Sequence, residues 1–488
     1  MVAGVAAALI VGGLATAMFV TRLPATYNMA EMGYPDYGGG PQPAQDAHAG
    51  HHHGGADDPT GTSIATLVEH TDGRLPDVRV ALTARAERVT LADGRQVDGY
   101  SLNGQTPGPT IEAVQGDLVE VTVTNSNVTA GITLHWHGMD VPNAEDGVAG
   151  VTQDAVLPGQ SHTYVFVADQ VGTYWYHSHQ QSHPQVVGGL LGAVVVRPRA
   201  GLAQRLDVPA VVHFYDGVRT INGRAGETHV DAAPGTAARV RIVNTDGNLM
   251  PVWVSGSAYR VLAMDGTEVN APTPITDAST IVTAGGRADL EVVAPADGSG
   301  VRVQMANASV VIGGRAAPTA SAPNRTVDLL TYGTPTGPAI DPATADRTFE
   351  YAIGRAPGVL DGKPGFWWTI DGHLFPDVPM FMVAEGDLVV MHLTNTSGES
   401  HPMHLHGHHV TVLAHNNVKA SGSPWTVDSL DVENGGDYLV AFRADNPGIW
   451  MDHCHNLPHA SEGLMTHLAY IGYTTPFRIG GASANHPE

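Results

Sequence analysis

The sequence contains a single cysteine, Cys454, among its 488 residues. An internal disulfide is therefore excluded, and a lone thiol is either inert core or a reactive group. Aromatic residues are also scarce, at 6% of the chain, whereas glycine and proline are frequent, with 58 and 33 residues. Short strands joined by many turns fit this composition better than long helices do.

Basic residues are the other shortage. The chain has 24 lysines and arginines against 48 aspartates and glutamates, which gives a formal net charge of −24. Such a surface repels a phosphate backbone, so nucleic acid is not expected as a partner. An acidic surface favours cationic or neutral partners, and it also serves simple solubility.

The first 21 residues, "MVAGVAAALIVGGLATAMFVT", carry no charged side chain before Arg22. Their length matches a membrane-spanning helix, whereas a cleaved signal normally has a basic start and a shorter apolar core. We expect residues 1–25 to be an uncleaved anchor rather than a removed signal. Either reading places the rest of the chain outside the cytoplasm, membrane-anchored or secreted.

Residues 26–73 are polar and irregular and contain "DAHAGHHHGGADD". This composition predicts a His- and Gly-rich disordered linker between the N-terminal segment and the folded body. The body then shows alternating apolar and polar positions, as in "IEAVQGDLVEVTVTN", which is typical of β-strands.

Internal repetition organises the body. "QGDLVEVTVTN" (115–125) returns as "EGDLVVMHLTN" (385–395), and a weaker echo, "PGTAARVRIVN", ends at Asn244. Each strong copy is followed by a His-x-His-Gly unit, "HWHG" or "HLHG", and later by "GTYWYHSH" or "GIWMDHCH". We expect three copies of one β-sandwich unit over 74–198, 204–334 and 345–476, followed by a tail, 477–488. The middle copy lacks the histidines and is expected to be a spacer.

Four clusters concentrate the histidines of the outer two units. They are His135 and His137; His177 and His179; His401, His404 and His406; and His453 and His455 with Cys454 between them and His459 after them. Histidines two apart on a strand project to one side. If the first and third units pack together, four such pairs can therefore line a single cavity with eight imidazoles.

The same alternation places Cys454 on the opposite face from His453 and His455. Cys454 therefore belongs to a second site, for which His401 and His459 are natural companions. Two imidazoles and one thiolate form the ligand set of a blue-copper electron-transfer centre. Zinc could also use such residues, and imidazole alone does not separate copper from zinc.

These motifs resemble the multicopper oxidases, in particular their three-domain, laccase-like bacterial members. The resemblance covers the chain from about residue 76 to residue 476. It implies an all-β fold of three consecutive cupredoxin-like Greek-key β-sandwich domains. It also implies four copper ions: one type 1, one type 2 and two type 3.

By this resemblance, His401, Cys454 and His459 would hold the type 1 copper, which accepts electrons from the reductant. The type 2 copper would be held by His135 and His404. The type 3 pair would be held by His137, His177, His179, His406, His453 and His455. The trinuclear cluster would bind O2 and reduce it to two waters.

Two positions depart from the family pattern. The axial position of the type 1 site falls ten residues after the cysteine, which is Leu464, a non-coordinating residue, rather than Met465. Many bacterial members also carry an acid six residues after the cysteine, where this chain has Ala460. Asp146, in "NAEDG", resembles the family's other proton-handling aspartate and is the candidate relay residue, although a turn aspartate before Gly147 is an equal alternative.

Three functions compete on this basis. The first is a laccase-like oxidase that takes electrons from phenolic or aromatic reductants and passes them to O2. The second is a metallo-oxidase for Cu(I), Fe(II) or Mn(II) in copper tolerance or metal homeostasis. The third is a non-enzymatic copper binder, against which the complete ligand set argues. A copper nitrite reductase would leave the eight cluster histidines unexplained.

Overall fold

The computed structural model describes residues 18–42, 61–337 and 339–488. Most of the expected N-terminal anchor (1–25) and the centre of the expected linker, including its histidine run, lie outside the described residues. Within the described ranges, no helix is both long and apolar enough to cross a membrane.

The first unit is a sandwich of two four-stranded sheets, in the orders β5-β4-β7-β9 and β6-β11-β10-β8. Trp136, Tyr164 and Phe166 fill the space between the sheets. The elements are β4 (Val78–Thr90), β5 (Gln96–Leu102), β6 (Ile111–Val114), β7 (Asp117–Asn125), β8 (His135–His137), η3 (Asn143–Glu145), β9 (Ser161–Ala168), β10 (Gly172–His177), α2 (Ser182–Val187) and β11 (Leu191–Arg197).

The second unit pairs a seven-stranded sheet with a five-stranded sheet, in the orders β14-β13-β12-β16-β21-β18-β19 and β15-β23-β22-β17-β20. The strands are β12 (Leu206–Tyr215), β13 (Val218–Ile221), β14 (Arg224–Ala225), β15 (Glu227–Val230), β16 (Ala237–Asn244), β17 (Met250–Ser255), β18 (Tyr259–Met264), β19 (Thr267–Glu268), β20 (Thr280–Val282), β21 (Arg287–Val293), β22 (Gly300–Met305) and β23 (Ala308–Gly313).

The third unit pairs a six-stranded sheet, β2-β27-β36-β35-β29-β33, with a sheet in the order β26-β25-β24-β28-β34-β30-β31. The edge strand β2 (Tyr34–Asp36) comes from the N-terminal part of the chain. Its elements are η4 (Pro342–Thr344), β24 (Arg347–Leu360), β25 (Lys363–Ile370), β26 (His373–Leu374), β27 (Pro379–Val383), β28 (Leu388–Asn395), β29 (His401–Leu405), β30 (Val410–His415), β31 (Val418–Lys419), β32 (Thr426–Val427), β33 (Ser429–Val432), β34 (Asp437–Arg443), β35 (Ile449–Cys454), α3 (Leu457–Ser461), β36 (Met465–Tyr470) and β37 (Tyr473–Thr474).

The sequence repeat corresponds to one structural device used three times. Each copy ends in a buried asparagine, Asn125, Asn244 or Asn395. Each side-chain amide donates to a carbonyl three or four residues ahead and to a second carbonyl on a distant segment: Val156, Val282 or Val432. A buried amide needs such partners, so the asparagine fixes the loop after the strand in every unit. The expected all-β fold of three consecutive sandwiches is confirmed, whereas the exact domain boundaries stay predictions.

The expectation of a disordered linker is wrong for its described parts. β1 (Thr26–Tyr27) pairs with β38 (Ile479–Gly480), and β2 (Tyr34–Asp36) pairs in parallel with β27 of the third unit. β3 (Thr62–Ser63) pairs with β37, and the short helices η1 (Met29–Glu31) and η2 (Ile64–Thr66) follow β1 and β3. The polar average of this stretch conceals two anchoring side chains, Met29 and Ile64, which are both buried in the main core.

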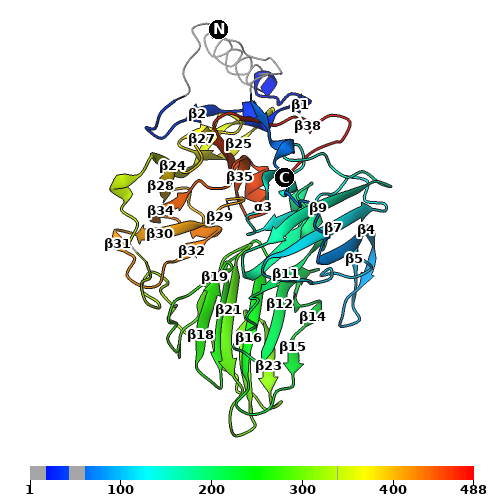
Figure 1. Ribbon diagram of the computed structural model, residues 1–488, viewed down its shortest axis with the longest axis vertical. Coiled ribbons are helices and arrows are strands. Elements are labelled where there is room, and N and C mark those ends of the chain that lie inside the picture. Colours follow the sequence, from blue (N-terminus) through cyan, green and yellow to red (C-terminus); the bar gives the residue numbers. More distant parts are fainter. Residues whose placement is uncertain (1–17, 43–60, 338) are drawn as a thin grey trace, which may run out of the picture.

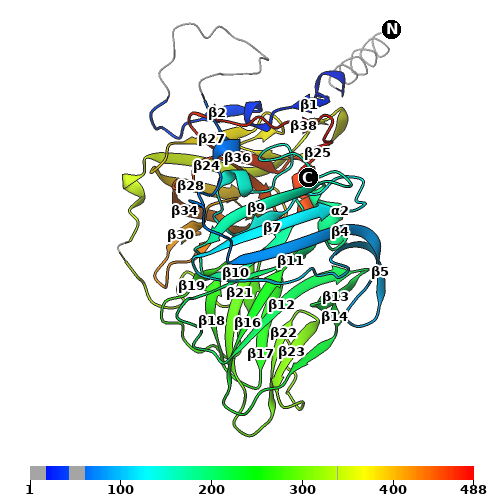
Figure 2. The ribbon, with the colours of Figure 1, turned by 45° about the vertical axis from the view of Figure 1, so that its right-hand side comes forward.

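The first and third units lie side by side, and the second unit lies beneath both of them in Figure 1 and in the turned view of Figure 2. The C-terminal end of the chain lies where the first and third units meet. This arrangement brings the histidine-bearing strands of the outer units together.

Candidate metal centres

Strand register presents the histidines of each outer unit on one side. In the first unit His135 on β8 lies opposite His177 on β10, and in the third unit His404 on β29 lies opposite His453 on β35. Directly opposed residues of antiparallel strands project to the same face of the sheet. Each unit therefore offers its histidines as a compact group.

The two groups meet at the interface between the units. His135 Nε2 lies 3.4 Å from His404 Nε2, and His453 Nε2 lies 3.4 Å from His179 Nε2 and 3.2 Å from His406 Nε2. All eight imidazoles that were expected in one cavity are at most 1% exposed: His135, His137, His177, His179, His404, His406, His453 and His455. The structure brings together every member of the predicted set.

The hydrogen bonds of the outer ring nitrogens show which nitrogens remain free to bind a metal ion. His135 Nδ1 donates to the carbonyl of Asp146 (2.9 Å), and His404 Nδ1 donates to the carbonyl of Asp428 (3.0 Å). A neutral imidazole has one N–H, so both Nε2 atoms, 3.4 Å apart, carry lone pairs. Two lone pairs that face each other at this distance repel each other unless a cation binds both of them. The donor set therefore fits a metal ion.

Other rings of the group also have one nitrogen in contact with a protein oxygen, which leaves the other nitrogen free. His177 Nδ1 donates to the carbonyl of Ser178 (3.0 Å), and His406 Nδ1 contacts the Asp146 carboxylate (3.0 Å). His137 Nδ1, His177 Nε2 and both ring nitrogens of His455 have no partner among the described residues. Burial lowers the pKa of His137, His177 and His453 well below the ordinary histidine value. Neutral rings with inward lone pairs are the metal-binding form of histidine.

A second, smaller group lies on the other face of β35. Cys454 Sγ lies 3.7 Å from His401 Nδ1 and 3.7 Å from His459 Nδ1, and the two nitrogens are 3.1 Å apart. Burial raises the pKa of the Cys454 thiol well above its ordinary value. A thiolate at this position therefore needs a cation beside it, as a soft metal ion would provide.

Strand pairing separates the two candidates for the axial position of this smaller group. Met465 on β36 is the Cα partner of His453 on β35, so its side chain lies on the face of the eight imidazoles. Leu464 is fully buried, and its carbonyl accepts from the Cys454 amide (3.1 Å). This geometry removes Met465 and leaves Leu464 as the axial candidate.

Acidic side chains reach the larger group from two directions. Asp146 is buried, and its carboxylate lies 3.1 Å from His135 Nδ1 and 3.0 Å from His406 Nδ1. Ala460 is buried and brings no acid. Glu488, in the segment expected to be a tail, is buried as well, with Oε1 3.2 Å from His453 Nδ1 and 3.8 Å from His179 Nε2.

The ring of His459 is the most exposed of the eleven candidate ligands. Its outer nitrogen, Nε2, lies 3.5 Å from Glu399 Oε2 and 3.2 Å from Asn456 Nδ2. The indole of Trp368 packs on the same ring, with centroids 4.5 Å apart, and donates to Glu462 (2.9 Å). An electron donor in solution can therefore approach the smaller group through His459.

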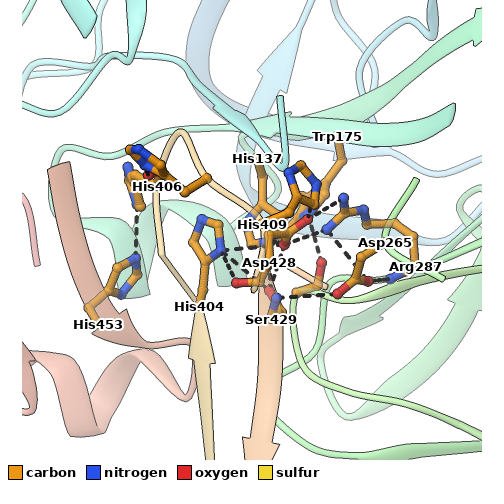
Figure 3. A network of polar contacts seen from close by, with 12 residues as sticks. His137, Trp175, Asp265, Arg287, His404, His406, His409, Asp428, Ser429 and His453 are labelled. Atoms are coloured by element: carbon orange, nitrogen blue, oxygen red, sulfur yellow. Dashed lines mark hydrogen bonds and ion pairs between the residues drawn. The ribbon is translucent and has the colours of Figure 1, made fainter. Parts of the chain in front are cut away.

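Sequence reasoning missed four residues of this region. Asp428, Arg287 and His409 form a polar network behind His137 and His404, which Figure 3 shows, and Glu488 closes the opposite side. None belongs to a repeated motif, and Arg287 comes from the histidine-free middle unit. No local sequence signal marks them.

Comparison with known proteins gives consistent results. Two sequence families, both described as multicopper oxidase, match residues 83–201 and 356–471. The chain is 28% identical over 446 residues to Laccase-1 of Botryotinia fuckeliana, an alignment that covers 76% of this chain and 78% of that protein.

Solved structures agree in fold. The multi-copper oxidase from Pseudomonas thermotolerans is 25% identical, with a TM-score of 0.67, and the match covers 80% of this chain and 98% of that one. Fet3p, a multicopper oxidase that functions in iron import, has a TM-score of 0.68 at 20% identity over 81% of this chain and 90% of that one, which shows the fold alone. The cupredoxin-like fold is thereby confirmed. The expected bacterial character is not, since a fungal laccase is among the relatives.

Proposed function

This chain belongs to the multicopper oxidase family, and we propose that it couples one-electron oxidation of phenolic or aromatic reductants to four-electron reduction of O2 to water. It is a copper-dependent oxidoreductase with O2 as the acceptor. Four donor molecules would each give one electron, and four protons with these electrons convert one O2 into two waters. When bound, copper would supply the one-electron steps at one site and, as a group of three ions, the reduction of O2 at the other.

The observation that carries the proposal is the position of Cys454, the last residue of β35, between His453 and His455. Cys454 faces His401 and His459, which with it would hold the type 1 copper. His453 faces the cluster, where His135 and His404 would hold the type 2 copper. The type 3 pair would be held by the other six histidines: His137, His177, His179, His406, His453 and His455. An electron that reaches the sulfur then crosses only two residues of backbone.

The surroundings of His459 support an organic donor. The buried Trp368 ring packs on the inner side of His459, with centroids 4.5 Å apart, and holds the ring edge toward the surface. The carboxylate of Glu399, 3.5 Å from His459 Nε2, can accept a hydrogen bond from a phenol hydroxyl or an aromatic amine. At the cluster, Asp146 would hold His135 and His406 in place and is the candidate relay residue for protons.

The alternative function is a metallo-oxidase acting on Cu(I), Fe(II) or Mn(II) in copper tolerance or metal homeostasis. Two carboxylates near His459, those of Glu399 and Glu462, favour it, as does the net charge of −24. Rates of O2 uptake with a simple phenol and with Cu(I) separate the two functions. Fast Cu(I) oxidation beside negligible phenol turnover would reject the laccase-like proposal.

We further propose an extracytoplasmic location, with the N-terminal segment as membrane anchor or signal. The support is the uncharged run before Arg22. Cell fractionation of the full chain, with a variant lacking residues 1–25 as control, tests the anchor. Recovery of both forms in the soluble fraction would contradict it.

Copper reconstitution of the purified chain tests the oxidase itself. We expect four coppers per chain, an intense blue absorption band, both type 1 and type 2 electron paramagnetic resonance signals, and O2 uptake that depends on the phenol. Fewer than three coppers per chain, with no O2 uptake, would instead indicate a non-enzymatic copper binder.

A further inference from the structure

The middle unit reaches the cluster through one buried arginine. Arg287, at the start of β21, is fully buried, and its guanidinium donates to both carboxylate oxygens of Asp428 in the third unit (2.7 and 2.5 Å). The same side chain donates through Nε to the Thr173 carbonyl of the first unit (3.1 Å). Arg287 therefore joins all three units at one point, as the close view in Figure 3 shows for its contact with Asp428.

Asp428 touches one imidazole from each outer unit. Its Oδ1 lies 3.1 Å from His137 Nε2 and 3.4 Å from His404 Nδ1, and its carbonyl accepts from His404 Nδ1 (3.0 Å). The two rings stack on each other with centroids 3.7 Å apart. A carboxylate only accepts hydrogen bonds, so it fixes the N–H of His137 at Nε2 and directs the lone pair at Nδ1 into the cluster.

A second cation holds Asp428 from the other side. His409 Nε2 lies 3.4 Å from Asp428 Oδ2, and His409 Nδ1 lies 3.2 Å from Asp140 Oδ1. Burial opposes protonation of His409, but the two carboxylates outweigh it and raise its pKa to about 10. Asp265 completes the network by accepting from the backbone amides of Arg287 (2.7 Å) and Ser429 (3.2 Å).

Two glycines allow the middle unit and the histidine cluster to approach each other closely. A Cβ at Gly138, the glycine of "HWHG", would lie 2.0 Å from Arg287 Nη2. A Cβ at Gly285, in the middle unit, would lie 2.8 Å from His137 Cε1 and 2.9 Å from the ring of His455. Both glycines have positive φ, so the close approach and the turn need the same residue type. The middle unit is thus packed directly against the cluster imidazoles.

We propose that Arg287 is a positioning residue for the trinuclear site: by fixing Asp428, it sets the tautomer and orientation of His137 and His404. The middle unit is then part of the cluster's outer shell rather than a spacer. The inference rests on the proposed function, because it takes the two imidazoles as copper ligands. Groups that orient a metal-bound histidine typically change metal affinity about ten- to a hundredfold when they are removed.

The test compares Arg287→Gln and Arg287→Lys with a matched control, Arg239→Gln, in copper-loaded full-length protein. Arg239 is also a buried arginine of the middle unit, and it pairs with Asp289 (2.7 Å) without contacting Asp428. Arg287→Lys keeps the buried charge but not the two parallel hydrogen bonds. It therefore serves as the second variant should the glutamine variant not fold.

Both Arg287 variants are expected to change the type 2 electron paramagnetic resonance signal. They should also release cluster copper to a chelator about ten- to a hundredfold more readily, with the blue band unchanged. Arg239→Gln should lower the melting temperature without altering either signal. Equal loss of both copper centres, or an unchanged type 2 signal in both Arg287 variants, would overturn the inference. Wild-type protein that binds no cluster copper would instead reject the proposed function.

Discussion

The negative charge of Glu399 beside His459 should make the electron-donor site prefer cationic phenols over anionic ones. Glu399→Gln removes one negative charge next to the exposed ring edge and leaves Arg355, which pairs with Glu399 at 3.2 Å, without its carboxylate. A charged donor at the ring edge would lie about 5 Å from the carboxylate. Two unit charges at that distance interact by about 0.8 kcal/mol in water and about 3 kcal/mol at an effective dielectric of 20.

The lower figure applies here because the Glu399 side chain is 48% exposed. It corresponds to a change of about fourfold in kcat/KM. The assay is steady-state O2 uptake with two phenols of similar size, one carrying a trimethylammonium group and one a sulfonate. Glu399→Gln should lower kcat/KM for the cationic phenol and raise it for the anionic one, and 0.5 M salt should reduce both effects.

A matched control is Glu385→Gln, which removes an exposed carboxylate from the same unit and is expected to leave both rates unchanged. A change in the same direction for both phenols would refute the reasoning, because it would indicate a steric or structural role for Glu399 rather than a charge effect.

Four further predictions follow from the geometry. Leu464→Met should lower the type 1 reduction potential in a redox titration, whereas Met465→Leu should leave it unchanged, because Met465 lies on the other face of the sheet. Cys454→Ser should abolish the blue band while metal analysis still finds three coppers per chain. Asp146→Asn should slow O2 turnover about tenfold, as expected for loss of about 1.4 kcal/mol in charge-assisted contacts to two rings, with phenol KM unchanged. The raised pKa of His409, about 10, means that its folding contribution is complete below pH 6.5 and is lost as pH rises through 10, so the difference in melting temperature between wild type and His409→Gln should shrink over that range.

The candidate ligands could be predicted because, in a strand, the spacing of residues in the sequence determines to which face of the sheet their side chains project. Residues two apart, such as His453 and His455, face one way, and the residue between them faces the other, whatever the rest of the fold does. Spacing from Cys454 favours Leu464 over Met465 for the axial position. The register of β35 against β36 gives an independent reason for the same choice.

The outer network could not be predicted, because its members come from three units and follow no periodicity. Arg287 and Asp428 are 141 residues apart, and they meet only because the middle unit docks beneath the other two. A buried arginine at the start of a strand otherwise reads as a surface residue. The order of the described parts of the expected linker could not be predicted for a related reason, because an average over a polar stretch hides single buried side chains such as Met29 and Ile64.

A carboxylate lies beside His453 even though the motif position for an acid is occupied by Ala460. The motif alone suggests that the cluster lacks a carboxylate on the His453 side. The last residues of the chain return to the junction of the two outer units, where Gln181 donates to the carbonyl of His486 (2.6 Å) and Ser182 donates to that of Pro487 (2.5 Å). They place Glu488 3.2 Å from His453. A buried carboxylate without a hydrogen-bonding partner among the described residues is costly. Its position beside the imidazoles is therefore best explained by the positive charge that copper would bring there.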